Sequence, residues 1–377
     1  MYENSLIEID RNALSSNITT IKKALPKKTL MMCVVKANAY GHGLSEIVSV
    51  LKAHPHVDWF GVFDFADAVS IRKASNKPVL VLSHTLERFW DVAVKKNISI
   101  TISHFEGLEK LLVYEHNKKI RFHIKVDTGL GRQGFLMKDM SRVIALLDSK
   151  QLVPEGLYSH FSAVEEKKFD RYSIEQHEKL LAWKNAFADV SMHPHIHLSA
   201  TAGVLRYPDF ACDIARVGIG MYGLWPSADT QASQKKDILK PVLSWKTYVS
   251  EVKTVPKGSA IAYDLTYIVT RPSTIAILPV GYFDGLPRSL SNRGYVLVHG
   301  QKAPILGRIM MNMCVVDVTD IPKVRSGDEV VLIGKQKKEM LSAEILAASA
   351  GTINYEIVTR LNAFINRVLV PLQKKQK

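Results

Sequence analysis

Eight short apolar segments, most of them separated by stretches with helical periodicity, occupy the chain up to residue 217. One such helical stretch follows the first segment and carries Ile47, Val48 and Leu51 on one side. Strands that alternate with helices pair in parallel, so this order predicts a (β/α)8 barrel. The predicted strands are residues 29–36, 59–63, 78–83, 98–103, 120–127, 154–161, 194–200 and 212–217.

The pattern changes after Pro226. Residues 227–240 are polar, and short alternating strands punctuated by turn residues such as Gly258 and Gly281 come after them. Ser342 is placed to cap one helix in this part of the chain. We therefore predict an α/β fold with an N-terminal barrel domain at residues 1–235 and a mainly β C-terminal domain at residues 236–377.

The net charge of +14 is compatible with nucleic-acid binding. However, the lysines occur as scattered pairs, denser only at 335–338 and in the tail at 374–377, and no aromatic-interleaved basic stripe accompanies them. Solubility is the simpler use of this charge, and we predict no nucleic-acid partner.

Three cysteines, at positions 33, 212 and 314, are an odd number without metal-ligand spacing, which favours structural thiols in a reducing compartment. No apolar run is long enough to span a bilayer, and the N-terminus lacks the pattern of a secretory signal. We expect a cytoplasmic protein with no membrane partner and no metal.

Polar residues follow five of the predicted strands at their C-terminal ends, where barrel enzymes place their functional groups. Each of them has a structural explanation when taken alone, such as a buried histidine bonded to backbone. Their convergence on one rim indicates a site. They are Lys36, the segment from Lys125 to Arg132, His160, the segment from His197 to Thr201, and the segment from Arg216 to Gly220.

Lys36 ends the first strand within the segment V-V-K-A-N-A-Y-G-H-G at residues 34–43. A lysine there either extends its amine to solvent or, with a lowered pKa, forms a Schiff base or carries a proton. The segment resembles the pyridoxal 5'-phosphate (PLP) lysine motif of alanine racemases. This resemblance implies that Lys36 binds PLP covalently and that Tyr40 contacts its phosphate.

The segment K-V-D-T-G-L-G-R-Q-G-F at residues 125–135 is similar to a second alanine racemase motif. The resemblance implies that Lys125 is carbamylated and bonds Arg132, which then helps to orient a catalytic tyrosine and lies in the substrate site. An unmodified Lys125 in a salt bridge is the alternative.

The segment A-R-V-G-I-G-M-Y-G at residues 215–223 resembles the family segment whose arginine faces the ring nitrogen of PLP. A guanidinium only donates, so a ring nitrogen facing Arg216 stays an unprotonated acceptor and the cofactor is a weaker electron sink. That favours reprotonation at Cα, and hence racemisation, over the reaction of the decarboxylases that share this barrel fold.

The resemblance also implies the remaining cofactor contacts, which are His160, His197, Thr201, Gly218, Ile219 and Tyr355. Phosphate is expected among backbone amides near Gly218 and Ile219. The family usually reads H-x-x-N-S-A where this chain has H-L-S-A-T-A at residues 197–202. Thr201 keeps a hydroxyl, whereas Ala200 lacks the amide.

Racemisation removes a proton from one face of Cα and returns one to the other, so two acid–base groups are needed. The segment I-A-Y-D-L-T-Y at residues 261–267 resembles the family segment that carries the second group. We predict Lys36 and Tyr263 as the pair, with packing in a strand as the alternative role for Tyr263. In the family this tyrosine comes from the other subunit, which implies a homodimer with shared active sites.

Two further resemblances concern the substrate. Tyr282 lines the entrance in relatives, and Met311 would offer its backbone N–H to the substrate carboxylate, although Met310 and Met311 also fit a core role. The chain is thus identified as a member of the alanine racemases, converting L-alanine to D-alanine and back to supply peptidoglycan. The alternatives are a racemase for serine, lysine or several amino acids, a PLP decarboxylase, and a non-enzymatic PLP carrier.

Overall fold

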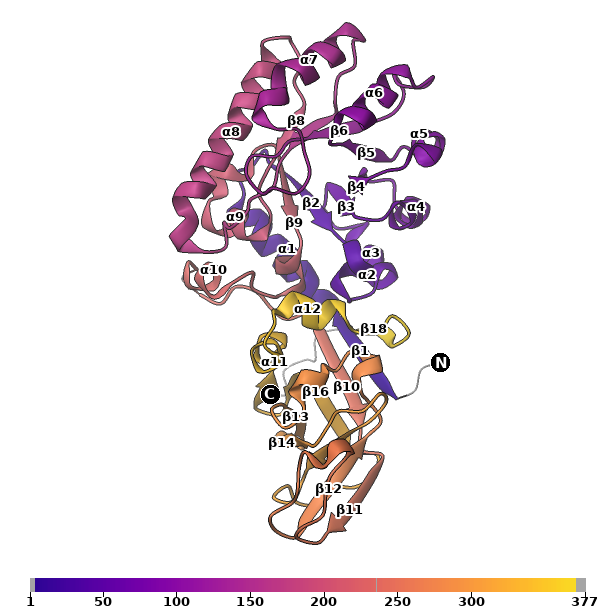
Figure 1. Ribbon diagram of the computed structural model, residues 1–377, viewed down its shortest axis with the longest axis vertical. Helices are drawn as coiled ribbons and strands as arrows, with labels where there is room; N and C mark the ends of the chain where they lie inside the picture. The colour runs from indigo at the N-terminus through magenta and orange to yellow at the C-terminus, as the bar shows by residue number, and fades with distance from the viewer. Residues whose placement is uncertain (1–3, 235, 371–377) are drawn as a thin grey trace. The chain divides into compact units, whose positions relative to one another are not determined.

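The computed structural model describes residues 4–234 and 236–370, which form two compact units (Figure 1). The barrel unit comprises Ser15–Lys36 and Val48–Leu239. The β unit comprises the described residues up to Leu14, Ala37–Ile47 and the described residues from Lys240 on. The lysine-rich tail at 374–377 lies outside the described residues, and the predicted domain division at residue 235 stays a prediction.

The barrel unit contains eight parallel strands in the order β8-β7-β6-β5-β4-β3-β2-β9, which confirms the predicted fold. The segments around β8 and β9 nearly close the ring, because Asp213 N donates to Ile196 O at 2.9 Å and Arg216 N donates to Ser199 O at 3.0 Å. The strands are β2 (Leu30–Val34), β3 (Trp59–Val62), β4 (Val79–His84), β5 (Ser99–Ile102), β6 (Phe122–Lys125), β7 (Gly156–Tyr158), β8 (His195–His197) and β9 (Ile214–Val217).

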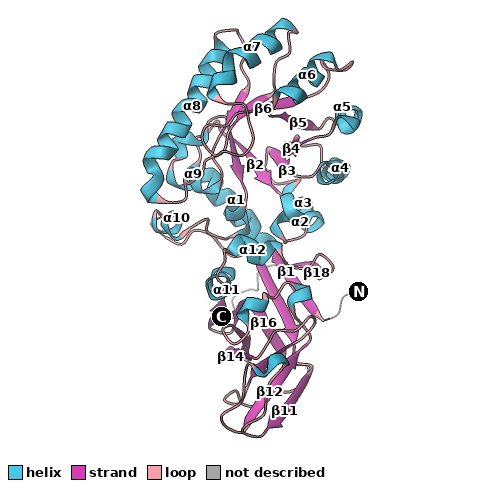
Figure 2. Ribbon diagram, viewed as in Figure 1, coloured by secondary structure: helices cyan, strands magenta, loops and turns pink. Residues whose placement is uncertain are grey.

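Helices connect these strands and lie around the outside of the ring (Figure 2). Inside it, Met32, Trp59, Leu80 and Ile214 pack together from four different strands. Apolar packing therefore fills part of the interior and leaves the C-terminal ends for polar groups. The helices of the chain up to residue 232 are α1 (Arg11–Ala24), α2 (Lys36–Tyr40), α3 (Leu44–Leu51), α4 (Phe65–Ala74), α5 (Trp90–Lys96), α6 (Phe105–Val113), α7 (Met140–Ser149), α8 (Asp170–Ala188), α9 (Thr201–Arg206) and α10 (Ala228–Ala232).

The β unit is built on one mixed sheet in the order β11-β12-β15-β14-β13-β16-β10-β1-β18, with β17 paired to β16. The N-terminal strand β1 pairs antiparallel with β10 and parallel with β18, so the start of the chain belongs to this sheet. Its strands are β1 (Ser5–Asp10), β10 (Leu243–Tyr248), β11 (Glu251–Val255), β12 (Ser273–Leu278), β13 (Tyr295–Val298), β14 (Gln301–Leu306), β15 (Cys314–Asp317), β16 (Glu329–Gln336), β17 (Glu339–Leu341) and β18 (Asn366–Val370).

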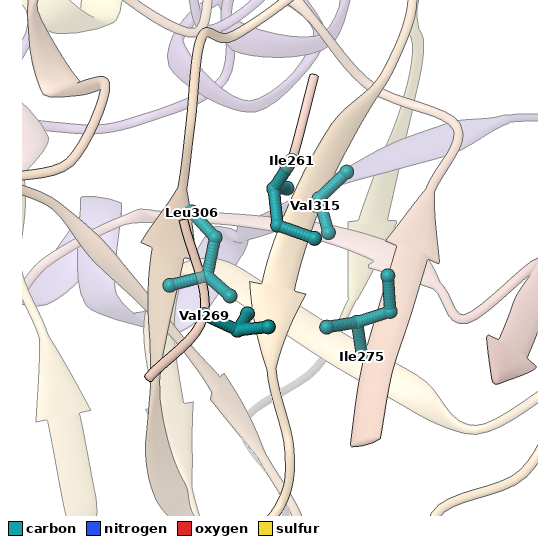
Figure 3. Packing of buried hydrophobic residues seen from close by; sticks show 5 residues of the cluster. All are labelled: Ile261, Val269, Ile275, Leu306 and Val315. Atoms are coloured by element: carbon teal, nitrogen blue, oxygen red, sulfur yellow. The ribbon is translucent and has the colours of Figure 1, made fainter. Parts of the chain in front are cut away.

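Two helices, α11 (Ala343–Ala350) and α12 (Asn354–Thr359), accompany the sheet. Ser342 caps α11 as predicted, because its hydroxyl accepts from Ile345 N at 3.3 Å. Five buried apolar residues of the β unit pack together (Figure 3), and they are Ile261, Val269, Ile275, Leu306 and Val315. Within residues 4–234 and 236–370, no helix is long and apolar enough to cross a membrane.

Candidate active site

The C-terminal ends of the barrel strands carry a cluster of buried polar side chains. Arg216 on β9 lies at its centre and is only 3% exposed. Its guanidinium donates to the backbone carbonyls of Ser159 and Leu198, both at 2.7 Å. Because every guanidinium N–H is a donor, Arg216 can present only donors to whatever else enters this site.

Two histidines also contact Arg216. His197 Nδ1 lies 2.8 Å from Arg216 Nη1, and His160 Nδ1 lies 3.1 Å from Nη2. Burial is the main cause that holds the pKa of each histidine well below its usual value, and the charge of Arg216 acts in the same direction. Both imidazoles are therefore neutral at neutral pH and can accept from the arginine.

Lys36 and Lys125 bring two amines to the same rim. Burial lowers the pKa of Lys36, and the charges of Arg132 and Arg216 lower it further. The same causes lower the pKa of Lys125 to about 8, and its side chain is 4% exposed with Gln133 Oε1 at 3.3 Å. Part of the Lys125 amine is therefore unprotonated near neutral pH. The lowered pKa of Lys36 shifts that amine toward the unprotonated form that a nucleophile or proton carrier requires.

The loop that carries Arg132 is held by one carboxylate. Asp127 accepts hydrogen bonds from the backbone N–H groups of Gly129, Leu130, Gly131 and Arg132 at 2.8–3.2 Å. Burial alone would raise the pKa of Asp127, but these bonds lower it below its usual value. The Arg132 backbone is thereby fixed next to β6, while its side chain remains exposed.

The turn after β9 forms a cradle of backbone amides. Thr201 Oγ1 accepts from Gly218 N at 3.2 Å and from Gly220 N at 3.3 Å. A Cβ at Gly220 would lie 2.4 Å from the Thr201 methyl, so glycine is needed there. Ala200 occupies the N-cap of α9, where an asparagine side chain could cap the helix and alanine cannot.

This rim suits an anionic cofactor. The charges of Arg132 and Arg216 lower the pKa values of Lys36 and Lys125, and Asp127 is the carboxylate that acts against this on Lys125. A phosphate group near the amides of the Gly218 turn would balance that excess positive charge. The residues present therefore fit PLP.

The β unit carries two further predicted cofactor residues on adjacent segments. The rings of Tyr40 and Tyr355 lie 6.2 Å apart at an interplanar angle of 51°. Tyr40 ends a left-handed turn in which Ala37, Asn38, Ala39 and Tyr40 all have φ of 52–53°. Such a run is costly for residues with a Cβ, which indicates a turn held for a purpose.

That left-handed turn is fixed within the β unit. Asn38 Oδ1 accepts from Leu44 N at 2.8 Å, and Arg367 Nε donates to Gly41 O at 2.9 Å. Gly41 itself has φ of +79°, and a Cβ there would overlap the Val358 carbonyl at 1.8 Å. The position therefore requires glycine.

Tyr263 stands at the tip of a loop whose base is tied down. Ile261 N donates to Tyr267 O and Val269 N donates to Ser259 O, both at 3.0 Å, and Ile261 and Val269 belong to the apolar cluster of Figure 3. The Tyr263 side chain is 65% exposed, which contradicts ordinary strand packing for this residue. Tyr282 and Met311 are also exposed, and Met311 is therefore not a core residue.

Sequence reasoning missed His123 and Glu155. His123 lies inside the barrel on β6, two residues before Lys125, and its Nδ1 is 2.9 Å from His197 Nε2. Its signal was a polar residue on the same face of the strand as Lys125. The sequence therefore showed that His123 shares a strand face with Lys125, but it did not show that His123 contacts His197 on β8.

Comparisons with known proteins find similarity over nearly the whole chain. The family described as alanine racemase, N-terminal domain, matches residues 9–226, and alanine racemase, C-terminal domain, matches residues 242–369. The alanine racemase of Halothermothrix orenii is 38% identical over 96% of this chain and 95% of that protein. The alanine racemase of Methylacidiphilum infernorum is 36% identical over 97% and 92%.

Solved structures show the same similarity. The crystal structure of alanine racemase from Bacillus anthracis with bound L-Ala-P matches with a TM-score of 0.90 and 31% identity, covering 99% of this chain and 97% of that one. The crystal structure of alanine racemase from E. faecalis matches with a TM-score of 0.89 and 30% identity, covering 98% of this chain and 99% of that one.

Proposed function

The chain belongs to the alanine racemase family and is an enzyme that interconverts L- and D-alanine, and we propose that Lys36 and Tyr263 are its two acid–base groups. The observation that carries the proposal is the cationic, buried rim centred on Arg216. It combines a donor-only side chain, two amines of depressed pKa and a backbone amide cradle. Its substrate is an amino acid.

The family depends on PLP, and we propose that this chain binds PLP at the rim. Lys36 would hold it covalently, and Thr201, Gly218, Ile219, Tyr40 and Tyr355 would hold its phosphate. His160 and His197 would support Arg216, which would donate to the ring nitrogen of the bound cofactor. When bound, PLP makes the Cα–H of an amino acid acidic by delocalising the charge left at Cα.

Lys36 moves a proton at its Nζ because its pKa is already lowered by burial and by two guanidinium groups. Tyr263 moves the other proton at its Oη. Since each group serves one face of Cα, loss of Tyr263 should leave an enzyme that exchanges a proton on one face without inverting the centre. Tyr263 would come from a second copy of the chain.

A second copy is supported by what surrounds Tyr263. Leu265 is 71% exposed and Met311 55% exposed, and Tyr282, Phe283 and Met313 are also exposed. We call these residues, with Tyr263, the apolar face. Exposed apolar groups of this number on one unit favour burial against a partner. A homodimer with shared sites is therefore proposed.

Substrate binding would use Arg132 and the backbone N–H of Met311 for the carboxylate, with Tyr282 at the entrance. Tyr355 would limit the side chain to a small group, which favours alanine over lysine and leaves serine as the second candidate. A decarboxylase is disfavoured because Arg216 offers only donors to the cofactor ring.

Lys125 is proposed to be carbamylated. With a pKa of about 8, roughly a tenth of its amine is unprotonated at pH 7 and able to attack CO2, forming an N–C bond and releasing one proton. The product carries a negative charge, which turns the repulsion from Arg132 into attraction. Cytoplasmic location and supply of D-alanine for peptidoglycan remain predictions from the sequence.

The deciding experiment uses the purified protein with PLP in D2O and separate L-amino acids, following the loss of Cα–H and the chirality of the product. Deuterated D-alanine is expected to form rapidly, with weaker reaction of serine and none of lysine. Exchange of Cα–H with another amino acid only would show that this amino acid, and not alanine, is the substrate. Absence of exchange with every amino acid, despite bound PLP, would contradict the proposal.

A further inference from the structure

A line of buried contacts extends from Arg216 away from the rim and through the barrel interior. His197 Nε2 lies 2.9 Å from His123 Nδ1, and His123 Nε2 lies 3.4 Å from Glu155 Oε2. Both histidine side chains are 0% exposed. Glu155 directly precedes β7, so the line runs from the N-terminal ends of the strands to the C-terminal rim.

Arg216 at one end of this line and Glu155 at the other favour the same proton positions. A guanidinium only donates, so His197 Nδ1 must accept and its proton must sit on Nε2. His197 then donates to His123 Nδ1, which places the second proton on His123 Nε2, facing the Glu155 carboxylate. At 3.4 Å the contact between His123 Nε2 and Glu155 Oε2 is a charge contact rather than a hydrogen bond, and the proton on His123 Nε2 is the one that faces the negative charge.

The barrel makes room for this arrangement. A Cβ at Gly156 would lie 2.1 Å from His123 Nδ1, so the first residue of β7 must be glycine for the ring to fit. The Tyr158 ring stacks on His197 at 4.6 Å and 8°, and Trp59 packs its ring against His123 at 5.5 Å. Neither imidazole is free to rotate, because close packing confines it.

The charges agree with the proton positions. Burial is the main cause that lowers the pKa values of His197 and His123, so both rings stay neutral at pH 7. Burial would raise the pKa of Glu155, but contacts with His123, Ser99 and Arg121 lower it overall, so it is a carboxylate. Its Oε1 also lies 3.3 Å from Arg121 Nη1, and its Oε2 accepts from Ser99 Oγ.

We propose that Glu155 and His123 are positioning residues that hold His197 in its Nε2–H tautomer and so keep Nδ1 directed at Arg216. The inference rests on the proposed function, because Arg216 is assigned to the cofactor ring. Without the Glu155 carboxylate, the proton of His123 loses its preference for Nε2. A His123 proton on Nδ1 would oppose the His197 Nε2–H, and His197 could relieve that contact only by placing its own proton on Nδ1, opposite an Arg216 N–H. The arginine would then shift relative to the cofactor.

The first test is nitrogen NMR of the PLP-loaded enzyme with 15N-labelled histidine, with resonances assigned from single His→Gln variants. Both His197 and His123 are expected as neutral Nε2–H tautomers near pH 7. An Nδ1–H tautomer or an imidazolium at His197 would overturn the inference. This readout does not depend on catalysis, so it separates failure of the inference from failure of the proposed function.

The second test compares Glu155→Leu, which removes the acceptor, with Glu155→Gln, which keeps an oxygen at that position. The leucine variant is expected to lose about tenfold in kcat with little change in KM for alanine, to shift the absorbance of bound PLP and to change the His197 tautomer. The glutamine variant is expected to recover most of each loss.

Asp58→Asn is the matched control, since Asp58 also directly precedes a barrel strand and accepts from backbone at Met31 N. It is expected to leave kcat, the absorbance and the tautomer unchanged. If Glu155→Leu does not fold, Gly156→Ala, which displaces His123 from the side, takes its place. A folded variant of either kind with native kcat and native tautomer would refute the positioning role.

Discussion

The rim of the barrel unit carries the proposed cofactor site and Lys36, whereas the apolar face of the β unit carries Tyr263, the second proposed acid–base group. The rim is largely buried and the apolar face is exposed. Arg216 is 3% exposed and its partners all lie at the C-terminal ends of β7 and β8 in its own barrel, whereas Tyr263 is 65% exposed on a loop held by backbone hydrogen bonds at its base. The side chains of the rim all come from one chain, and a bound anion would balance their excess positive charge. The loop of Tyr263 is held at its base, and its exposed apolar neighbours would be buried only against a partner surface.

This contrast shows that a single chain can position the buried side chains of a shared site, whereas an exposed loop residue depends on a partner. A barrel fixes side chains through paired strands on both sides, so charges of one sign can be held together there at the expense of depressed lysine pKa values. A loop tip has neighbours on one side only. Substitutions in each region test whether the rim and the apolar face depend on each other for activity.

The largest effect is expected for Tyr263→Phe, which removes the Oη proton while keeping the ring. Racemisation should fall by about 10²–10⁴-fold, because a positioned acid–base group is lost. Bound PLP absorbance should persist, and exchange of Cα–H in D2O should continue for one enantiomer only. Tyr267→Phe in the same loop serves as control, and equal rates for Tyr263→Phe and wild type would exclude the two-base assignment.

A large but concentration-dependent effect is expected for Leu265→Asp, which places a charge in the apolar face. Sedimentation velocity should show a shift from dimer to monomer, and activity should fall in proportion, while PLP absorbance at the rim is retained. Val113→Asp is the matched control, since Val113 is exposed on the barrel unit. A monomeric variant with full activity would show that Tyr263 acts within its own chain.

A stability effect of roughly 3 kcal/mol is expected from Lys125, whose folded pKa of about 8 lies below its ordinary value of 10.5. Between pH 8 and 10.5 the unfolded chain binds a proton there that the folded chain does not, so stability rises with pH across this window. Lys125→Met should remove that rise in urea unfolding done in CO2-free buffer.

The matched control for Lys125→Met is Lys138→Met, at an exposed lysine beyond the same loop. It should retain the rise of stability with pH. If both variants follow the wild-type curve, the amine of Lys125 is not held in a repulsive site, and the case for carbamylation weakens with it.

The smallest effect is expected for Asn38→Ala, which removes the bond to Leu44 N in the left-handed turn. The loss should be about 1 kcal/mol in the free energy of unfolding, as for the loss of a helix cap. Activity should change little, because Lys36 is held by the end of β2. A loss of activity larger than the loss of stability would show that the turn also positions Lys36.

Periodicity predicted the barrel well because the rule behind it is local. All eight predicted strands are present, and the polar residues after five of them do lie at one rim. Sequence reasoning did not place β1 in the β sheet, because its partners β10 and β18 come more than two hundred residues later. Pairing over such a separation depends on the tertiary fold rather than on local pattern.

The sequence by itself determined the residue types that the chemistry needs, their order on successive strands and the family to which the motifs belong. The roles assigned to Lys36, Tyr40, Arg132 and Tyr263 remain predictions. Only the tertiary structure decided that His123 and Glu155 continue the contacts of Arg216 and that Tyr263 is exposed. The reason is physical: hydrogen-bond direction, burial and the depressed pKa values arise from neighbours that the chain order does not place together.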